Sequence, residues 1–163
     1  MMRPSNSQTP KPQQPMSNHT AHLAALITTR DQIIPHARIL VAGDADSCRD
    51  VFAAVLSRSG YDVAIAVNGA DALERIAAEK FDLLLTDREM PVLDGGRLVL
   101  ALRSARLQIP VVMLFWAFAA TPLPGAIARE LFAALEKPVC VFTFLSTIAA
   151  ALQSTLQPVL CVA

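Results

Sequence analysis

The sequence has no net charge, few cysteines and no charged residue after Lys137. Its 14 basic and 14 acidic residues cancel at neutral pH. A nucleic-acid-binding domain would carry a basic excess, so we expect no nucleic-acid partner. The scattered cysteines Cys48, Cys140 and Cys161 form no metal-binding spacing and suit a reducing, cytoplasmic compartment. The N-terminus lacks an apolar core, so we expect no secretory signal.

Hydrophobic residues make up 53% of the chain, and the uncharged run from Val139 to Leu156 approaches the length of a membrane span. Polar residues interrupt this run, among them Thr143, Ser146 and Gln153. We therefore expect a helix that covers a sheet, with an unusually apolar outer face, and no membrane association.

The chain divides into three parts by composition. Residues 1–17 are rich in Pro, Ser, Gln and Asn, which predicts a disordered tail over residues 1–37 in which Ala21 to Thr29 can form one or two helical turns. Residues 38–156 form one predicted domain, and residues 157–163 an apolar extension. At 163 residues the chain is long enough for one domain with a full core.

Within this domain, apolar runs alternate with segments of helical periodicity. We predict five strands, at residues 38–42, 62–66, 83–86, 111–115 and 133–136, and helices at residues 46–59, 70–79, 96–105, 126–132 and 142–156. Strict alternation implies an α/β fold, a doubly wound parallel five-stranded sheet with right-handed crossovers and helices on both faces.

Charged residues follow three of the predicted strands. Asp44 comes after the first strand, Asp87 ends the third and Lys137 follows the fifth. Open α/β sheets bind their ligands at the carboxyl ends of the strands. Two carboxylates suit Mg²⁺, and a lysine beside them can neutralise a transferring phosphoryl group. Taken alone, Asp44 could instead cap the first helix, and Lys137 could be a surface lysine.

A short string of residues is the most specific signal in the chain. The pattern D-x-x-M-P-x-x-D-G runs from Asp87 to Gly95, and Lys137-Pro138 follows the fifth strand. With these motifs the region from Arg38 to Leu156 resembles the receiver domain of two-component response regulators, which has the flavodoxin-like (βα)₅ fold.

The resemblance implies a role for each matching residue. Asp87 would be the phosphoacceptor and Lys137 would contact the phosphoryl group, with a cis bond to Pro138. Mg²⁺ would be held by Asp44, Asp87 and the backbone carbonyl of Glu89. The protein would act in a phosphorelay and not as an enzyme, receiving phosphate from a sensor histidine kinase or a histidine phosphotransfer protein.

Three positions depart from the family pattern. Gly43 replaces the first of two adjacent acids, Phe115 replaces a hydroxyl residue after the fourth strand, and Ala134 replaces an aromatic residue on the fifth strand. These losses support an alternative, a phosphorylation-independent pseudo-receiver that acts as a protein-binding module. A flavin-binding protein is disfavoured, because the loop after the first strand lacks a Ser/Thr/Gly-rich phosphate cradle.

Output is expected through protein contacts. The predicted domain leaves no room for a separate output domain, and the apolar fifth helix suggests a binding face. We expect the helices at 126–132 and 142–156 to bind a downstream protein or a second copy of the chain.

Overall fold

The computed structural model describes residues 36–44, 46–117 and 122–156. Its elements are β1 (Arg38–Ala42), α2 (Asp46–Arg58), β2 (Asp62–Ala66), α3 (Gly69–Ala78), β3 (Leu83–Asp87), α4 (Gly95–Ser104), β4 (Val111–Trp116), α5 (Gly125–Ala128), β5 (Ala133–Lys137) and α6 (Val141–Leu156). The five strands form one parallel sheet in the order β2-β1-β3-β4-β5. This confirms the predicted fold class. The predicted short helix at Ala21 to Thr29 and the extension at 157–163 lie outside the described residues.

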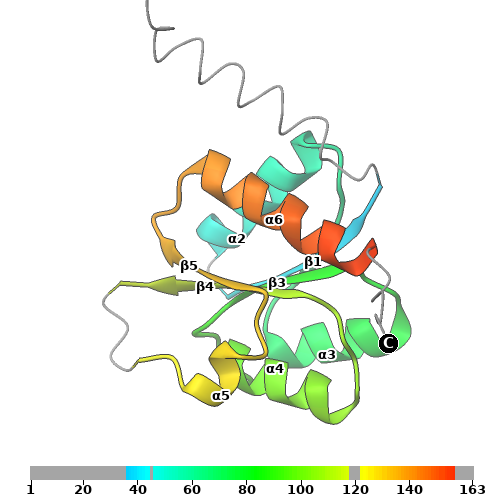
Figure 1. Cartoon of the computed structure of the whole chain (residues 1–163), viewed down its shortest axis with the longest axis vertical. Coiled ribbons are helices and arrows are strands. Elements are labelled where there is room, and N and C mark those ends of the chain that lie inside the picture. Colours follow the sequence, from blue (N-terminus) through cyan, green and yellow to red (C-terminus); the bar gives the residue numbers. More distant parts are fainter. Residues whose placement is uncertain (1–35, 45, 118–121, 157–163) are drawn as a thin grey trace, which may run out of the picture.

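Helices cover both faces of the sheet, α2 and α6 on one side and α3, α4 and α5 on the other (Figure 1). In β1, β3 and β4, alternate residues enter one of two separate cores. In β3, Leu83 and Leu85 pack against α2 and α6, whereas Leu84 packs against α3 and α4. Because every β3 side chain is buried, this strand reads as a continuous apolar run until it reaches Thr86 and Asp87.

Side-chain caps begin two of the helices on the lower face. The Asn68 side chain accepts hydrogen bonds from the backbone N–H groups of Ala70 and Asp71 at the start of α3. Asp94 accepts from the backbone N–H of Arg97 at 2.8 Å and so caps α4. Asp94 is therefore a helix cap, and it shapes the loop that follows Asp87.

Helix α5 is shorter than predicted. The sequence predicts a helix over residues 126–132, but the helix covers only Gly125–Ala128. The chain then turns, because the Arg103 guanidinium of α4 binds both the carboxylate and the backbone carbonyl of Glu130. The backbone N–H of Phe132 meanwhile donates to Val111 of β4 at 2.8 Å, so the chain must already be extended there.

Helix α6 packs on the sheet as expected. It buries Phe144, Ile148 and Leu152 in the core shared with α2. Within the described parts of the chain, no helix combines the length and the apolar character that a membrane span requires. The large apolar side chains that α6 exposes lie at its N-terminal end, where Val141 is 57% and Phe142 37% exposed. The other described residues exposed on α6 are Thr, Ala, Gln and Ser, so the expectation of an unusually apolar outer face is wrong for most of this helix.

Replacing a central core residue tests this two-core arrangement. Leu84 is fully buried on β3, so Leu84→Ala is expected to lower the free energy of unfolding by about 3 kcal/mol, measured by urea denaturation. Leu100→Ala removes a half-exposed leucine of α4 and serves as the control, with a much smaller loss. Equal losses in the two variants would contradict the assigned core.

Candidate functional site

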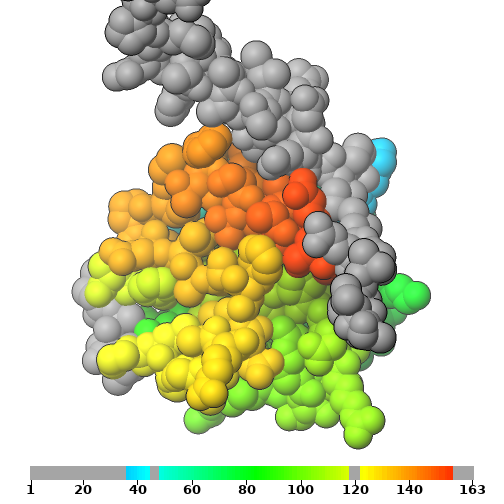
Figure 2. All heavy atoms as spheres, viewed as in Figure 1, coloured from blue at the N-terminus to red at the C-terminus, as the bar shows by residue number. Residues whose placement is uncertain are grey.

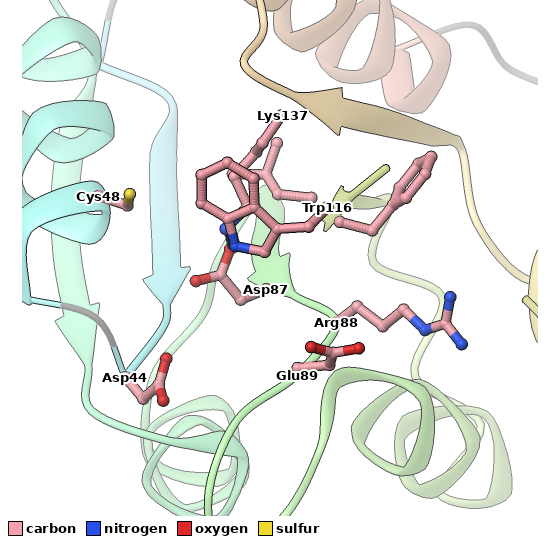
Figure 3. A pocket seen from close by; sticks show the side chains of 9 residues that line it. Asp44, Cys48, Asp87, Arg88, Glu89, Trp116 and Lys137 are labelled. Atoms are coloured by element: carbon pink, nitrogen blue, oxygen red, sulfur yellow. Dashed lines mark hydrogen bonds and ion pairs between the residues drawn. The ribbon is translucent and has the colours of Figure 1, made fainter. Parts of the chain in front are cut away.

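A hollow at the carboxyl edge of the sheet collects the charged residues at or just after the ends of β1, β3 and β5. Its lining includes Asp44, Asp87, Glu89 and Lys137, together with the aromatic residues at the end of β4. Figure 3 shows the carboxylates of Asp44, Asp87 and Glu89 arranged around this hollow. The structure thus places the predicted site residues at one edge, as expected for a parallel sheet.

Asp87 and Lys137 form a buried ion pair. The Lys137 Nζ lies 2.6 Å from Asp87 Oδ1, and each residue is only 6% exposed. Strand β4 separates the two strands in the sheet, and the register pairs Asp87 with Leu114 and Lys137 with Trp116. Lys137 reaches across this intervening strand to the acid. Its burial rules out the alternative of a surface lysine.

Burial raises the pKa of Asp87 above its ordinary value of 3.8. Desolvation is the largest cause, because the charged carboxylate loses contact with water. The hydrogen bond and the charge of Lys137 lower the pKa, and the negative charge of Asp44 raises it. The two carboxylates therefore interact electrostatically. A cation placed between them would relieve both their repulsion and the desolvation of Asp87.

The segment after β1 supplies Gly43 and the exposed Asp44. A Cβ added to Gly43 would lie 2.9 Å from Asp87 Oδ2, so the absence of a side chain leaves room for the Asp87 carboxylate. Arg49 of α2 donates a hydrogen bond to the carbonyl oxygen of Gly43 at 3.2 Å. This bond ties the segment to α2 and fixes the backbone beside the ion pair.

The loop after β3 is held against Asp87 by glycine. The backbone N–H of Gly95 donates to the carbonyl of Arg88 at 2.9 Å. A Cβ on Gly95 would collide with the carbonyl oxygen of Asp87, so no other residue fits there without displacing the strand end. The Asp94-Gly95 pair thereby both caps α4 and closes the loop that carries Glu89.

The donors at this edge fit Mg²⁺. Among the residues that the structure describes, no three His, Cys, Asp or Glu side chains group closely enough to hold a metal ion by themselves. Mg²⁺ needs only one or two protein carboxylates because it keeps several waters. Asp44 and Asp87 line the same hollow as Glu89. With Gly43 in place of an acid, Asp44 and Asp87 are the two carboxylates that these strand ends offer the ion.

Two aromatic residues form the rim at the end of β4. Phe115 lines the hollow where the family has a hydroxyl residue, and it also lines a neighbouring hollow beside Ala134. Trp116 stands over Lys137, with the ammonium 5.0 Å from the centre of its ring. The contact between Trp116 and Lys137 depends on the pairing of β4 with β5. In the sequence, the only sign that Trp116 belongs to the site is its position directly after an apolar run.

The chain belongs to the response regulator receiver domain family, whose sequence profile matches residues 39–149. The peptide bond between Lys137 and Pro138 is cis, as the resemblance implied. The predicted membership and fold are confirmed together.

Individual relatives support this membership. The receiver protein CpdR of Brucella abortus is 39% identical over 103 residues, which cover 62% of this chain and 84% of CpdR. The transcriptional regulatory protein PhoP of Bacillus subtilis is 40% identical over 77 residues, 47% of this chain. The match spans only 32% of PhoP, about a third of its length.

A solved structure shows the same fold. The response regulator TrrA of Thermotoga maritima, solved in complex with Mg²⁺ and BeF, superposes with a TM-score of 0.63 at 22% identity. The superposition covers 70% of this chain and 97% of TrrA.

The raised pKa of Asp87 predicts how the effect of Asp87→Asn depends on pH. A native pKa above the unfolded value means that Asp87 stabilises the fold most below the unfolded pKa, and that this contribution is lost as pH rises through the native pKa. The Asp87→Asn variant has no carboxyl group to ionise at this position, so it does not lose this stability as pH rises. Its free energy of unfolding relative to the natural protein should therefore increase as pH rises from about 3.8 through the native pKa.

Urea denaturation at a series of pH values measures this difference. Asp62→Asn, at an exposed acid far from the hollow, provides the control. Parallel pH profiles for the natural protein and Asp87→Asn would contradict the raised pKa.

Proposed function

We propose that this protein is a phosphorelay receiver that accepts a phosphoryl group on Asp87 from a histidine kinase or a histidine phosphotransfer protein. The observation that carries the proposal is the buried pair of Asp87 and Lys137 beside Asp44 in one hollow. Membership of the receiver family supports it. We propose a signalling module in the cytoplasm and not an enzyme that turns over an external substrate.

The chain's own groups account for the transfer. A carboxylate oxygen of Asp87 would attack phosphorus in line with the bond to the donor nitrogen, which leaves with the electrons of that bond. The product is an acyl phosphate on Asp87. Lys137 is already within hydrogen-bonding distance of the carboxylate, where it would offset charge on the phosphoryl oxygens.

Mg²⁺ is the proposed cofactor, held by the carboxylates of Asp44 and Asp87 and by the backbone carbonyl of Glu89. When bound, it would neutralise negative charge on the transferring group. The TrrA complex contains both Mg²⁺ and BeF, and we extend the metal to this chain on the donor set described above. The negative charge of Asp44 already raises the pKa of Asp87 without a ligand, which a bound cation would offset.

Output is proposed to pass through protein contacts over α5 and α6. These helices and β5 form much of the face seen in Figure 2. Phe132, Val141 and Phe142 are exposed on this part of the chain. A downstream protein or a second copy would cover them.

The second candidate is a pseudo-receiver that binds partners without phosphate. The specific observations in its favour are the aromatic ring of Phe115 at the hollow, the missing ring at Ala134 and the missing acid at Gly43. Phenylalanine cannot donate a hydrogen bond to a phosphoryl oxygen.

Labelling with a small phosphodonor separates the two candidates. Incubation with Mg²⁺ and acetyl phosphate is expected to add the mass of one phosphoryl group, detected by intact-protein mass spectrometry. Asp87→Asn should abolish the added mass, because the amide is not a nucleophile toward phosphorus. Asp62→Asn should retain it. Absence of labelling in the natural protein with acetyl phosphate, phosphoramidate and carbamoyl phosphate would favour the pseudo-receiver.

Restoring the missing acid tests the metal assignment. Gly43→Asp is expected to tighten Mg²⁺ binding about tenfold, because a further carboxylate joins the donor set. Trp116, the chain's one tryptophan, lines the hollow and supplies the fluorescence signal for a Mg²⁺ titration.

Gly43→Ala is the matched control. Its Cβ brings the same approach to Asp87 Oδ2 without a new charge. Equal affinities in the two variants would show that Mg²⁺ does not bind beside position 43.

A further inference from the structure

We propose that Trp116 is a positioning residue that covers the Lys137 ammonium, keeps it on Asp87 and shields the acyl phosphate from water. This inference rests on the proposed function only for the acyl phosphate. The position of Lys137 can be tested without phosphorylation.

The sheet register places Trp116 where it can act on Lys137. The two residues are paired at the ends of β4 and β5. Lys137 points its ammonium toward Asp87 Oδ1 at 2.6 Å and toward the indole face at 5.0 Å from the ring centre. The ammonium thus has a carboxylate on one side and an aromatic face on another. Both contacts attract the ammonium and restrict its long side chain to one position.

The indole lies at the boundary of two hollows, together with Lys137 and Cys48. Trp116 and Lys137 line the polar hollow that holds Asp44, Asp87 and Glu89. They line a second, apolar groove between α2 and the start of α6, with Phe52, Val55 and Phe144 among its walls. Figure 3 shows the indole ring extending from the end of β4 across the position of Lys137 toward Asp87. Removing the ring would join the groove to the polar hollow and open a second route to Asp87.

Such an opening has a chemical consequence. Hydrolysis of the acyl phosphate breaks its P–O bond: water adds to phosphorus, inorganic phosphate leaves and the Asp87 carboxylate is restored. The rate depends on how easily water reaches phosphorus in line with that bond. An indole that fills one side of the site limits this approach, so the phosphorylated state should outlast that of a variant with a smaller side chain.

The accessibility of Lys137 tests the positioning directly. Trace acetylation with acetic anhydride, followed by peptide mass spectrometry, gives the rate at Lys137 relative to the exposed Lys80. Trp116→Leu keeps an apolar side chain but removes the aromatic face, and it should raise this ratio about fivefold. Trp116→Phe keeps an aromatic face, so its acetylation ratio should lie close to that of the natural protein. Leu107→Ala removes a large apolar side chain of similar exposure, 39% against 37%, and should leave the ratio unchanged.

The same variants test the shielding. After labelling with acetyl phosphate and removal of the donor, the half-life of the added phosphoryl mass should shorten in Trp116→Leu and recover in Trp116→Phe. The inference would be overturned if Trp116→Leu and the natural protein had the same acetylation ratio for Lys137. It would also be overturned if their phosphorylated forms had equal half-lives. Failure of every protein to be labelled would overturn the proposed function instead, and the acetylation ratio would still decide whether Trp116 positions Lys137.

Discussion

A buried ion pair joins the third and fifth strands of this protein at the edge where the sheet presents its carboxyl ends. Asp87 and Lys137 are both almost fully removed from water and 2.6 Å apart. Removing two charges from water opposes folding, and the attraction between them offsets this only when the geometry is close. The pair is therefore poor evidence for stability. Its presence at an edge that also carries Asp44 and Glu89 fits the proposed phosphoryl transfer, because a lysine held on a carboxylate would meet an incoming phosphoryl group.

The surroundings of the pair are unusual on three sides. Toward β1, Gly43 leaves a space into which Asp87 Oδ2 points, and the acid that would have filled it is absent. Toward β4, Phe115 lines the hollow where a hydroxyl residue is expected. Above Lys137, Trp116 supplies an aromatic face. Compared with the family pattern, the site therefore has fewer negative charges and more aromatic surface.

The rest of the fold positions this edge. Two separate cores hold the sheet, and the central strand β3 contributes to both through alternate leucines. The high apolar content of the chain is thereby explained by a sheet that is covered on both faces. Gly95 and the Asp94 cap hold the loop after β3, which carries Glu89, against the end of the strand.

The sequence alone determined the order of the elements, the parallel sheet and the edge at which Asp44, Asp87 and Lys137 gather. The reason is that apolar runs, helical periodicity and strand-end residues are local signals, and a parallel sheet brings all of its carboxyl ends together. The predicted length of α5 was wrong. Arg103 of α4 binds the carboxylate and the carbonyl of Glu130 and so ends the helix early, and this contact joins segments far apart in the chain. Only the tertiary structure decided that Lys137 is buried on Asp87 beneath Trp116. That arrangement depends on the register between β4 and β5, and no local pattern in either strand encodes the register.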